Sequence, residues 1–279
     1  MQKFVEQKFI GERAMFGAKD AEFERCGFAA GESPLKHGQN LRLKNCTFEW
    51  KYPLWYTKNV AVEDGFLMQM ARAGVWYAQD VSFKDTLIQA PKSFRRCQNV
   101  RLENVNLTQA EETLWSCEDM EIKNVCARGD YFAMNCENVR VYGLNLDGNY
   151  GFDGCKNLLV EDSKLLSKDA FWNCENVTVR NSFISGEYLA WNSKNVTFEN
   201  CVIESLQGLC YVQNLVLRGC QTLDTTLAFE YSSVDAEILG GIASVKNPLS
   251  GVIRAKEIGE IIMQKECVDP AATRIILEK

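Results

Sequence analysis

The residues best suited to chemistry in this sequence are three carboxylates, Asp130, Asp169 and Glu187. Paired carboxylates carry out glycoside hydrolysis, and the distance between them sets the stereochemical outcome. If their segments stack as neighbouring strands, Asp169 and Glu187 would lie about 5 Å apart and Asp130 and Asp169 about 10 Å apart. We treat all three as candidate catalytic acids. The alternative is a solvated surface, because any acidic column on stacked strands offers such spacing.

Aromatic side chains accompany these carboxylates at a regular interval, as between Trp172 and Trp191, 19 residues apart. An exposed row of rings suits sugars, which stack on flat π-faces, or a protein partner. In the earlier repeats along the chain, the same segment carries basic residues. The candidate ligand-binding residues are Trp55, Trp76, Arg72, Lys92, Arg95, Trp115, Trp172 and Trp191.

The residue before each tryptophan is also apolar, as in Leu54-Trp55 and Phe171-Trp172. Neighbours on a strand point to opposite faces, so both columns cannot be buried if this segment is a strand. One of them would then line the surface or a groove. The alternatives are that bends let both columns pack, or that a terminal segment covers them.

A repeat of about 19 residues supplies the elements that would position these side chains. The phrase Asn-hydrophobic-x-hydrophobic-charged-Asn recurs along the chain, and we call its leading Asn or Asp the anchor. Such a period indicates a repeat architecture. The anchors are Asp20, Asn40, Asn59, Asp80, Asn99, Asp119, Asn138, Asn157, Asn176, Asn195, Asn214 and Asp235.

Columns of similar residues identify the repeat as a β-coil. Apolar residues occupy the first and third positions after each anchor, and this alternation is typical of a strand with one buried face. The fifth position holds only Asn, Asp or Gly, which tolerate a left-handed corner. Charges at the fourth position alternate in sign from coil to coil, as in Lys44, Glu63 and Lys84. The main alternative is a leucine-rich repeat, which needs a framework of leucines and a helix in each repeat. Here β-branched residues fill the columns, and corners every few residues leave no room for a helix.

The predicted fold is therefore all-β, a single-stranded, right-handed parallel β-helix of about 12–13 short coils with about 19 residues per coil. We expect one domain over residues 1–279. Residues 1–19 would form an N-terminal cap, 20–235 the regular coils, and 236–279 the last coils and a C-terminal cap, because an uncapped end exposes unpaired backbone groups.

Nine of the 12 cysteines follow the same repeat. Both of their columns favour a small, weakly polar, buried side chain, which cysteine provides. We expect buried, reduced ladders rather than disulfides or a metal site. The first column lies two residues before an anchor and the second six residues after one: Cys97, Cys117, Cys136, Cys155 and Cys174, then Cys26, Cys46, Cys201 and Cys220.

The composition of the chain argues against several kinds of binding partner. The formal net charge of −6 argues against a general nucleic-acid binder, which needs excess Lys and Arg. No apolar run reaches the length of a spanning helix, and the first residues do not resemble a signal peptide, so we expect a cytoplasmic protein without a membrane partner. His37 is the only histidine and no nucleotide motif occurs, so we expect no metal and no cofactor.

Several segments resemble a bacterial family of uncharacterised proteins, the domain-of-unknown-function family 3737. They include Tyr52–Tyr56, Ala71–Tyr77, Gln89–Arg96, Ser167–Asn173, Thr225–Tyr231 and Ser244–Pro248. The resemblance implies a pectin-lyase-like β-helix and a bacterial cytoplasmic protein. It implies no catalytic residues.

Two hypotheses about function follow. The first is a protein that binds or processes carbohydrate through its aromatic and acidic face, which as an enzyme would be similar to a polysaccharide lyase or glycoside hydrolase. The second is a non-catalytic scaffold that self-associates as a homodimer through the same apolar face.

Overall fold

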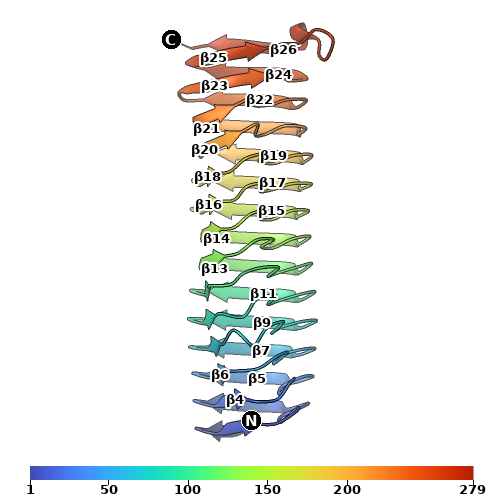
Figure 1. Ribbon diagram of the computed structural model, residues 1–279, viewed down its shortest axis with the longest axis vertical. Helices are drawn as coiled ribbons and strands as arrows, with labels where there is room; N and C mark the ends of the chain where they lie inside the picture. The colour runs from blue at the N-terminus through green and yellow to red at the C-terminus, as the bar shows by residue number, and fades with distance from the viewer. Residues whose placement is uncertain (279) are drawn as a thin grey trace. The chain divides into compact units, whose positions relative to one another are not determined.

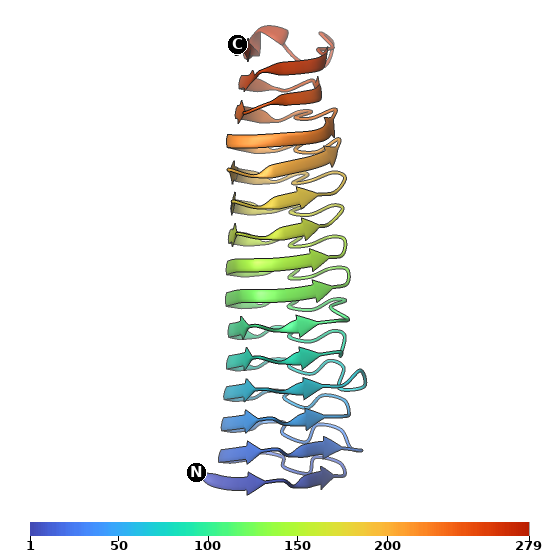
Figure 2. The ribbon, with the colours of Figure 1, turned by 90° about the vertical axis from the view of Figure 1, so that its left-hand side faces the viewer.

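The computed structural model describes residues 1–278, which divide into two compact units, residues 1–145 and residues from 146 onward. In both units two short strands and a turn segment make one coil, and the strands follow one another in chain order (Figure 1). Within each unit the turn segments gather on one side of the strands (Figure 2). Residues 1–278 contain no α-helix, only a 3₁₀ helix at Pro270–Ala272. The predicted all-β parallel solenoid is confirmed.

Unit 1 stacks its strands in two parallel columns. The first strands of its coils are β1 (Gln2–Val5), β3 (Lys19–Glu24), β5 (Gln39–Lys44), β7 (Lys58–Glu63), β9 (Gln79–Lys84), β11 (Gln98–Glu103) and β13 (Glu118–Arg128). The second strands are β2 (Lys8–Ile10), β4 (Gly27–Ala29), β6 (Thr47–Phe48), β8 (Phe66–Leu67), β10 (Leu87–Ile88) and β12 (Asn106–Leu107). Residues 1–19, expected as a cap, form a further coil, since β1 pairs with β3 and β2 with β4.

Unit 2 repeats this arrangement, and β14 (Glu137–Asp147) spans the boundary between the units. The first strands of its coils are β15 (Lys156–Glu161), β17 (Glu175–Arg180), β19 (Lys194–Glu199), β21 (Gln213–Thr226), β22 (Ser233–Ile238), β24 (Ser250–Ala255) and β26 (Thr273–Leu277). The second strands are β16 (Lys164–Leu166), β18 (Phe183–Ser185), β20 (Val202–Leu206), β23 (Gly241–Lys246) and β25 (Glu257–Ile262). Residues 1–278 form about 15 turns, more than predicted, because the presumed caps are coils as well.

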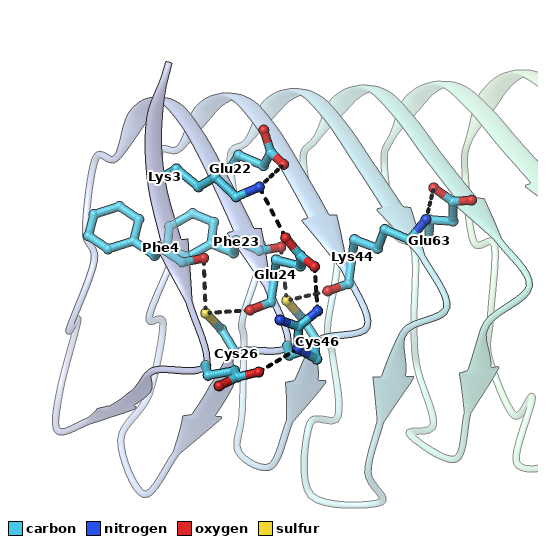
Figure 3. Close-up of polar contacts among 11 residues, drawn as sticks. Lys3, Phe4, Glu22, Phe23, Glu24, Cys26, Lys44, Cys46 and Glu63 are labelled. Carbon is cyan, nitrogen blue, oxygen red and sulfur yellow. Dashed lines mark hydrogen bonds and ion pairs between the residues drawn. The ribbon is translucent and has the colours of Figure 1, made fainter.

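The predicted columns pair in register. In unit 1, Leu41 pairs with Val60 and Val60 with Val81, and all three are at most 2% exposed. The charged column forms ion pairs between coils, as between Lys44 and Glu63 at 3.7 Å (Figure 3). A slip of one residue would turn the apolar column to solvent, so the pattern specifies the register strongly.

The prediction that Asp235 is the last anchor is wrong. Leu215 pairs with Val234, so Ser233 occupies the place that Asn214 holds in the coil before. Asp235 lies on β22 between two arginines, and its carboxylate forms ion pairs with Arg218 and, at 3.0 Å, with Arg254. An acidic side chain like that of an anchor therefore lies at Asp235, two residues after the true anchor position, which is Ser233.

Side chains of the anchors form ladders with one another from coil to coil. Asn195 and Asn214 each donate from Nδ2 to Oδ1 of the preceding anchor at 2.9 Å. Asn195 has a positive φ of 54°, which Asn tolerates better than most residues. An Asp accepts but cannot donate, so it begins a ladder, as Asp20 does for Asn40.

The cysteine columns are buried as predicted. Cys26 and Cys46 are at most 2% exposed, and their thiols donate to the carbonyls of Phe4 and Phe23, respectively, in the coil before (Figure 3). In the other column the backbone N–H of Cys97 donates to Cys117 Sγ at 3.4 Å. The thiols thus satisfy backbone groups inside the coils, which a purely apolar side chain would leave unpaired.

Thiol accessibility should follow this burial. We expect only Cys126 and Cys267, the two exposed cysteines, to react rapidly with Ellman's reagent in the folded protein. Burial raises the pKa of Cys46 to about 11 and that of Cys174 to about 12, so little reactive thiolate forms near neutral pH. Denaturation without a reductant should release all 12 thiols. A Cys126→Ser, Cys267→Ser variant should lose the rapid phase, and a denatured count below 12 would show that ladder members are bridged.

Candidate functional site

The turn segment of each coil carries the predicted site residues, and it is not a strand. Positive φ values recur at alternate residues, as at Asp169 (58°), Phe171 (62°) and Asn173 (54°). Leu54, Phe171 and their equivalents in the coils point inward and are fully buried, whereas the following tryptophans are half-buried. The tryptophan column is therefore the outward one.

In unit 1 the faces of the tryptophan rings are covered by one another and by basic side chains. The rings of Trp55 and Trp76 stack in parallel, with centroids 5.1 Å apart and 7° between the planes. The guanidinium of Arg95 lies between the next two rings, 4.7 Å from Trp76 and 4.9 Å from Trp115. Lys36 contacts Trp55 at 5.6 Å. Cations and rings that stack in this way stabilise the coil and leave few ring faces open for a ligand.

The basic residues predicted to bind a ligand in unit 1 are largely paired. Glu112 forms ion pairs with Arg95 at 2.9 Å and with Lys92 at 3.0 Å. Burial acts to raise the pKa of Glu112, but its bonds to Lys92 and Arg95 outweigh burial and lower that pKa. Arg72 is exposed on the same side of the coils. Lys92 and Arg95 are therefore engaged by Glu112, although Arg95 Nε is buried without a hydrogen-bond partner among residues 1–278.

The predicted acids divide between the units. Asp130 lies in unit 1, where its backbone oxygen accepts a hydrogen bond from the N–H of Glu112 at 2.9 Å. Asp169 and Glu187 lie on consecutive coils of unit 2, joined by a bond from the N–H of Asp169 to the carbonyl of Glu187 at 2.9 Å. Glu187 forms an ion pair with Lys168 at 2.9 Å. Of the two acids in unit 2, only Asp169 lacks a cationic partner among the described residues.

Asp169 is unusual because its carboxylate is buried and incompletely bonded. The residue is 3% exposed, and its Oδ1 has no hydrogen-bond partner among residues 1–278. Burial raises the pKa of Asp169, and the charges of Glu187 and Asp153 act in the same direction. Lys168 and a hydrogen bond with Tyr150 oppose this rise in pKa. A buried carboxylate in this state costs folding free energy, which is typical of groups retained for a function.

Replacing this carboxylate should stabilise the protein. We expect Asp169→Asn to raise the free energy of unfolding at pH 7 by about 1–2 kcal/mol, because an amide avoids the cost of a buried charge. The folded state holds its proton more tightly than the unfolded state does. Wild-type stability should therefore fall as the pH rises from the ordinary pKa of 3.8 through the raised folded pKa.

The asparagine variant should lack that fall, and urea unfolding between pH 4 and pH 7 measures it. Asp162→Asn, at an exposed corner of the same unit, is the control and should leave the pH dependence unchanged. A less stable Asp169→Asn variant at pH 7 would contradict the assignment.

The aromatic rings on the turn segments of unit 2 are tilted, whereas Trp55 and Trp76 of unit 1 stack in parallel. Trp172 donates from Nε1 to the carbonyl of Tyr188 at 2.7 Å, which fixes its orientation. The rings of Trp172 and Trp191 are tilted by 35°, and those of Trp191 and Tyr211 by 37°. Tilted rings cover less of one another's faces than parallel rings do. The centroids of Trp191 and Tyr211 are nevertheless only 4.6 Å apart, and Lys168 lies over the Tyr188 ring at 5.4 Å. We call this surface the unit 2 turn face: Tyr150, Asp169, Trp172, Tyr188, Trp191 and Tyr211.

The predicted site omitted the tyrosines. Tyr150 bonds to Asp169 and stands 19 residues before it, so the repeat itself was the signal that could have paired them. An open hollow of about 480 Å³ in unit 1 was also missed, with Trp50, Met68 and Met70 in its lining. No group of three or more His, Cys, Asp or Glu side chains within residues 1–278 is placed to hold a metal ion. None of these residues forms a helix that is both long and apolar enough to cross a membrane.

Coils, buried ladders and an aromatic turn segment define a parallel β-solenoid with a buried acid, Asp169, in one of its turn segments. The chain belongs to the family described as protein of unknown function (DUF3737), whose model matches residues 2–276. The predicted family is thus confirmed. No curated protein matches the chain.

Several solved structures of similar architecture match weakly. The surface adhesin PfbA of Streptococcus pneumoniae is 12% identical, with 77% of this chain and 71% of that one covered and a TM-score of 0.42. The A-module of the mannuronan C-5 epimerase AlgE4 of Azotobacter vinelandii is 10% identical over 99% and 87% of the two chains, with a TM-score of 0.29. HetL of Nostoc sp. strain PCC 7120, a pentapeptide repeat protein, is 8% identical over 80% and 92%, with a TM-score of 0.27. At these scores the likenesses carry no argument about activity.

Proposed function

We propose that this chain is a carbohydrate-binding β-solenoid and that the unit 2 turn face is its binding surface. The observation that carries the proposal is the pair of half-buried rings of Trp172 and Trp191, tilted by 35° instead of stacked in parallel, on a segment that also carries carboxylates, Asp153, Asp169 and Glu187. Sugars stack on aromatic faces and donate hydroxyl groups to carboxylates, so this combination matches both their apolar and polar surfaces.

Binding is favoured over hydrolysis because the second acid of unit 2 is engaged. Glycoside hydrolases use two carboxyl groups, one as an acid and the other as a base or nucleophile. Glu187 is held by Lys168 at 2.9 Å, and both side chains are about 45% exposed. The proposal is therefore a binding protein, with Trp172 and Trp191 as stacking platforms.

A glycan array tests this proposal with two matched double variants. We expect Trp172→Ala, Trp191→Ala to lose binding, because both platforms are removed. Trp55→Ala, Trp76→Ala removes two rings at the same repeat position in unit 1, where the faces are already stacked, and should keep binding. No signal from the wild-type protein, or unchanged binding by the first variant, would overturn the proposal.

A second candidate function is a self-associating scaffold. The sequence placed its interface on the aromatic face with Trp55 and Trp76, whose rings stack on one another, whereas the structure favours the first coil. Phe4 and Phe9 point inward but are half-exposed, whereas Phe23 and Phe28, which pair with them, are at most 1% exposed. Among residues 1–278, β1 pairs with β3 and β2 with β4, on one side only. Open strand edges beside apolar rings are templates for pairing with another chain.

Light scattering at micromolar concentration tests self-association. We expect a dimer that Val5→Lys, Ile10→Lys converts to a monomer, because edge lysines oppose strand pairing. Ala61→Lys, an exposed position inside the coils, is the control and should remain dimeric. A wild-type monomer would exclude the scaffold hypothesis and leave the carbohydrate proposal standing.

A further inference from the structure

We infer that the open hollow in unit 1 is a binding site for a neutral, N-acetylated sugar. This site shares no residue with the unit 2 turn face, and the inference does not depend on the proposed function. The volume of the hollow, about 480 Å³, lies within the range of small-molecule sites. Its lining includes residues that follow β6, β8 and β10: Glu49, Trp50, Met68, Gln69, Met70 and Gln89.

An insertion in one coil contributes three of these residues. The anchors Asn59 and Asp80 are 21 residues apart, whereas the next anchor, Asn99, follows after 19. Strands β7 and β8 have the same lengths as β9 and β10, so the extra residues lie in the turn segment after β8. There the N–H of Ala71 donates to the carbonyl of Met68 at 2.8 Å, and the segment projects beyond those of neighbouring coils (Figure 2). Insertions in solenoids often lie on the binding face.

The apolar part of the lining is accessible. Trp50, Met68 and Met70 are 36%, 37% and 38% exposed, respectively. Lys51 lies over the Trp50 ring at 5.5 Å, but it forms an ion pair with Glu32 at 3.0 Å and is not part of the lining. A ring and two thioethers in one hollow offer apolar contacts to the C–H face of a pyranose and to a methyl group.

Two carboxamides supply the polar part of the site. The side chains of Gln69 and Gln89 form no hydrogen bond with other residues of 1–278. Each provides a donor and an acceptor, which match the carbonyl and the N–H of an acetamido group. Among residues 1–278 no lysine or arginine lines the hollow, whereas Glu49 does, so an anionic sugar would meet a charge of the same sign. Lys8 pairs with Glu49 at 3.6 Å, but the two side chains are 59% and 38% exposed, so solvent screens the pair.

A peptide strand fits this surface less well than a sugar does. Strand β6 pairs with β4 and β8, and β10 pairs with β8 and β12. The second strands beside the hollow therefore have partners on both sides and leave no edge for an added strand. The free carboxamides and the exposed ring then favour a ligand that carries its own amide on a compact apolar ring.

Titration calorimetry with three neutral ligands tests the inference: N-acetylated chitotriose, cellotriose and acetyl-trialanine amide. We expect chitotriose to bind about tenfold more tightly than cellotriose, which has the same linkage but no acetamido group, on the scale of one or two hydrogen bonds. Trp50→Ala should weaken chitotriose binding about tenfold. Gln69→Ala, Gln89→Ala should bring the ratio of the two affinities close to one. Tyr56→Ala removes a ring that is 42% exposed in unit 1 outside the hollow, and this control should preserve both affinities.

Several results would overturn the inference. They are a failure of the wild-type protein to bind chitotriose, equal affinity for chitotriose and cellotriose, tighter binding of the peptide, or unchanged chitotriose binding by Trp50→Ala.

The Trp172→Ala, Trp191→Ala variant separates this inference from the proposed function, because it should bind chitotriose as the wild-type protein does. Loss of chitotriose binding in that variant would place the ligand on the unit 2 turn face, which would overturn this inference while the proposed function stands. Chitotriose binding that only the hollow variants weaken would support the inference even if the proposed function failed.

Discussion

Gly251→Ala should remove most of the stability of unit 2. A Cβ at this position would lie 1.9 Å from the backbone oxygen of Val234, and the φ of 117° is one that L side chains rarely adopt. Gly251 pairs in register with Val234, so the clash cannot be relieved by turning a side chain. We expect a loss of more than about 4 kcal/mol, which is exceptional for a single substitution. Urea unfolding followed by circular dichroism measures it.

Gly240→Ala is the matched control in the same unit. A Cβ there would meet nothing within 4 Å. Its effect should stay within about 0.5 kcal/mol, as at other surface positions. If Gly251→Ala unfolded at the wild-type urea concentration, the close approach of β22 and β24 at this glycine would be wrong.

Phe171→Ala should destabilise unit 2 by about 3–5 kcal/mol, the usual cost of removing a large buried ring. Phe171 is fully buried, stacks on Phe152 at 5.7 Å and contacts the edge of Phe198 at 6.3 Å. It directly precedes Trp172, so it also supports the proposed binding surface. The free energy of unfolding and the near-ultraviolet signal of the tryptophans measure the two effects.

Two substitutions define the scale of this prediction. Phe171→Leu keeps most of the apolar volume and the positive φ and should cost less than half as much as alanine. Phe16→Ala removes a ring that is 49% exposed in unit 1 and should cost less than about 1 kcal/mol. A loss of less than 1 kcal/mol for Phe171→Ala would contradict its place in the core.

The repeat in the sequence was enough to predict the coils, their columns and the buried cysteines. In stacked parallel strands each residue has the same neighbours from coil to coil, so one periodic pattern contains most of the long-range contacts. Leu41, Val60 and Val81 are paired as the period requires. At Asp235 the residue type misled the assignment although the period held, because Ser233 lies 19 residues after Asn214 and takes its place. Asp235 instead forms ion pairs with arginines on the neighbouring strands β21 and β24.

The direction and pairing of the side chains on the turn segments could be found only from the tertiary structure. Alternating left-handed residues such as Asp169 and Phe171 give this segment neither strand nor helix periodicity, so side-chain direction could not be read from spacing. Contacts between coils pair Arg95 with two tryptophans and with Glu112. They also bury Asp169 without an ion pair. The sequence by itself determined which residues stack. Only the tertiary structure decided which charges are neutralised, because ion pairing depends on distances and solvent access that a repeat pattern does not contain.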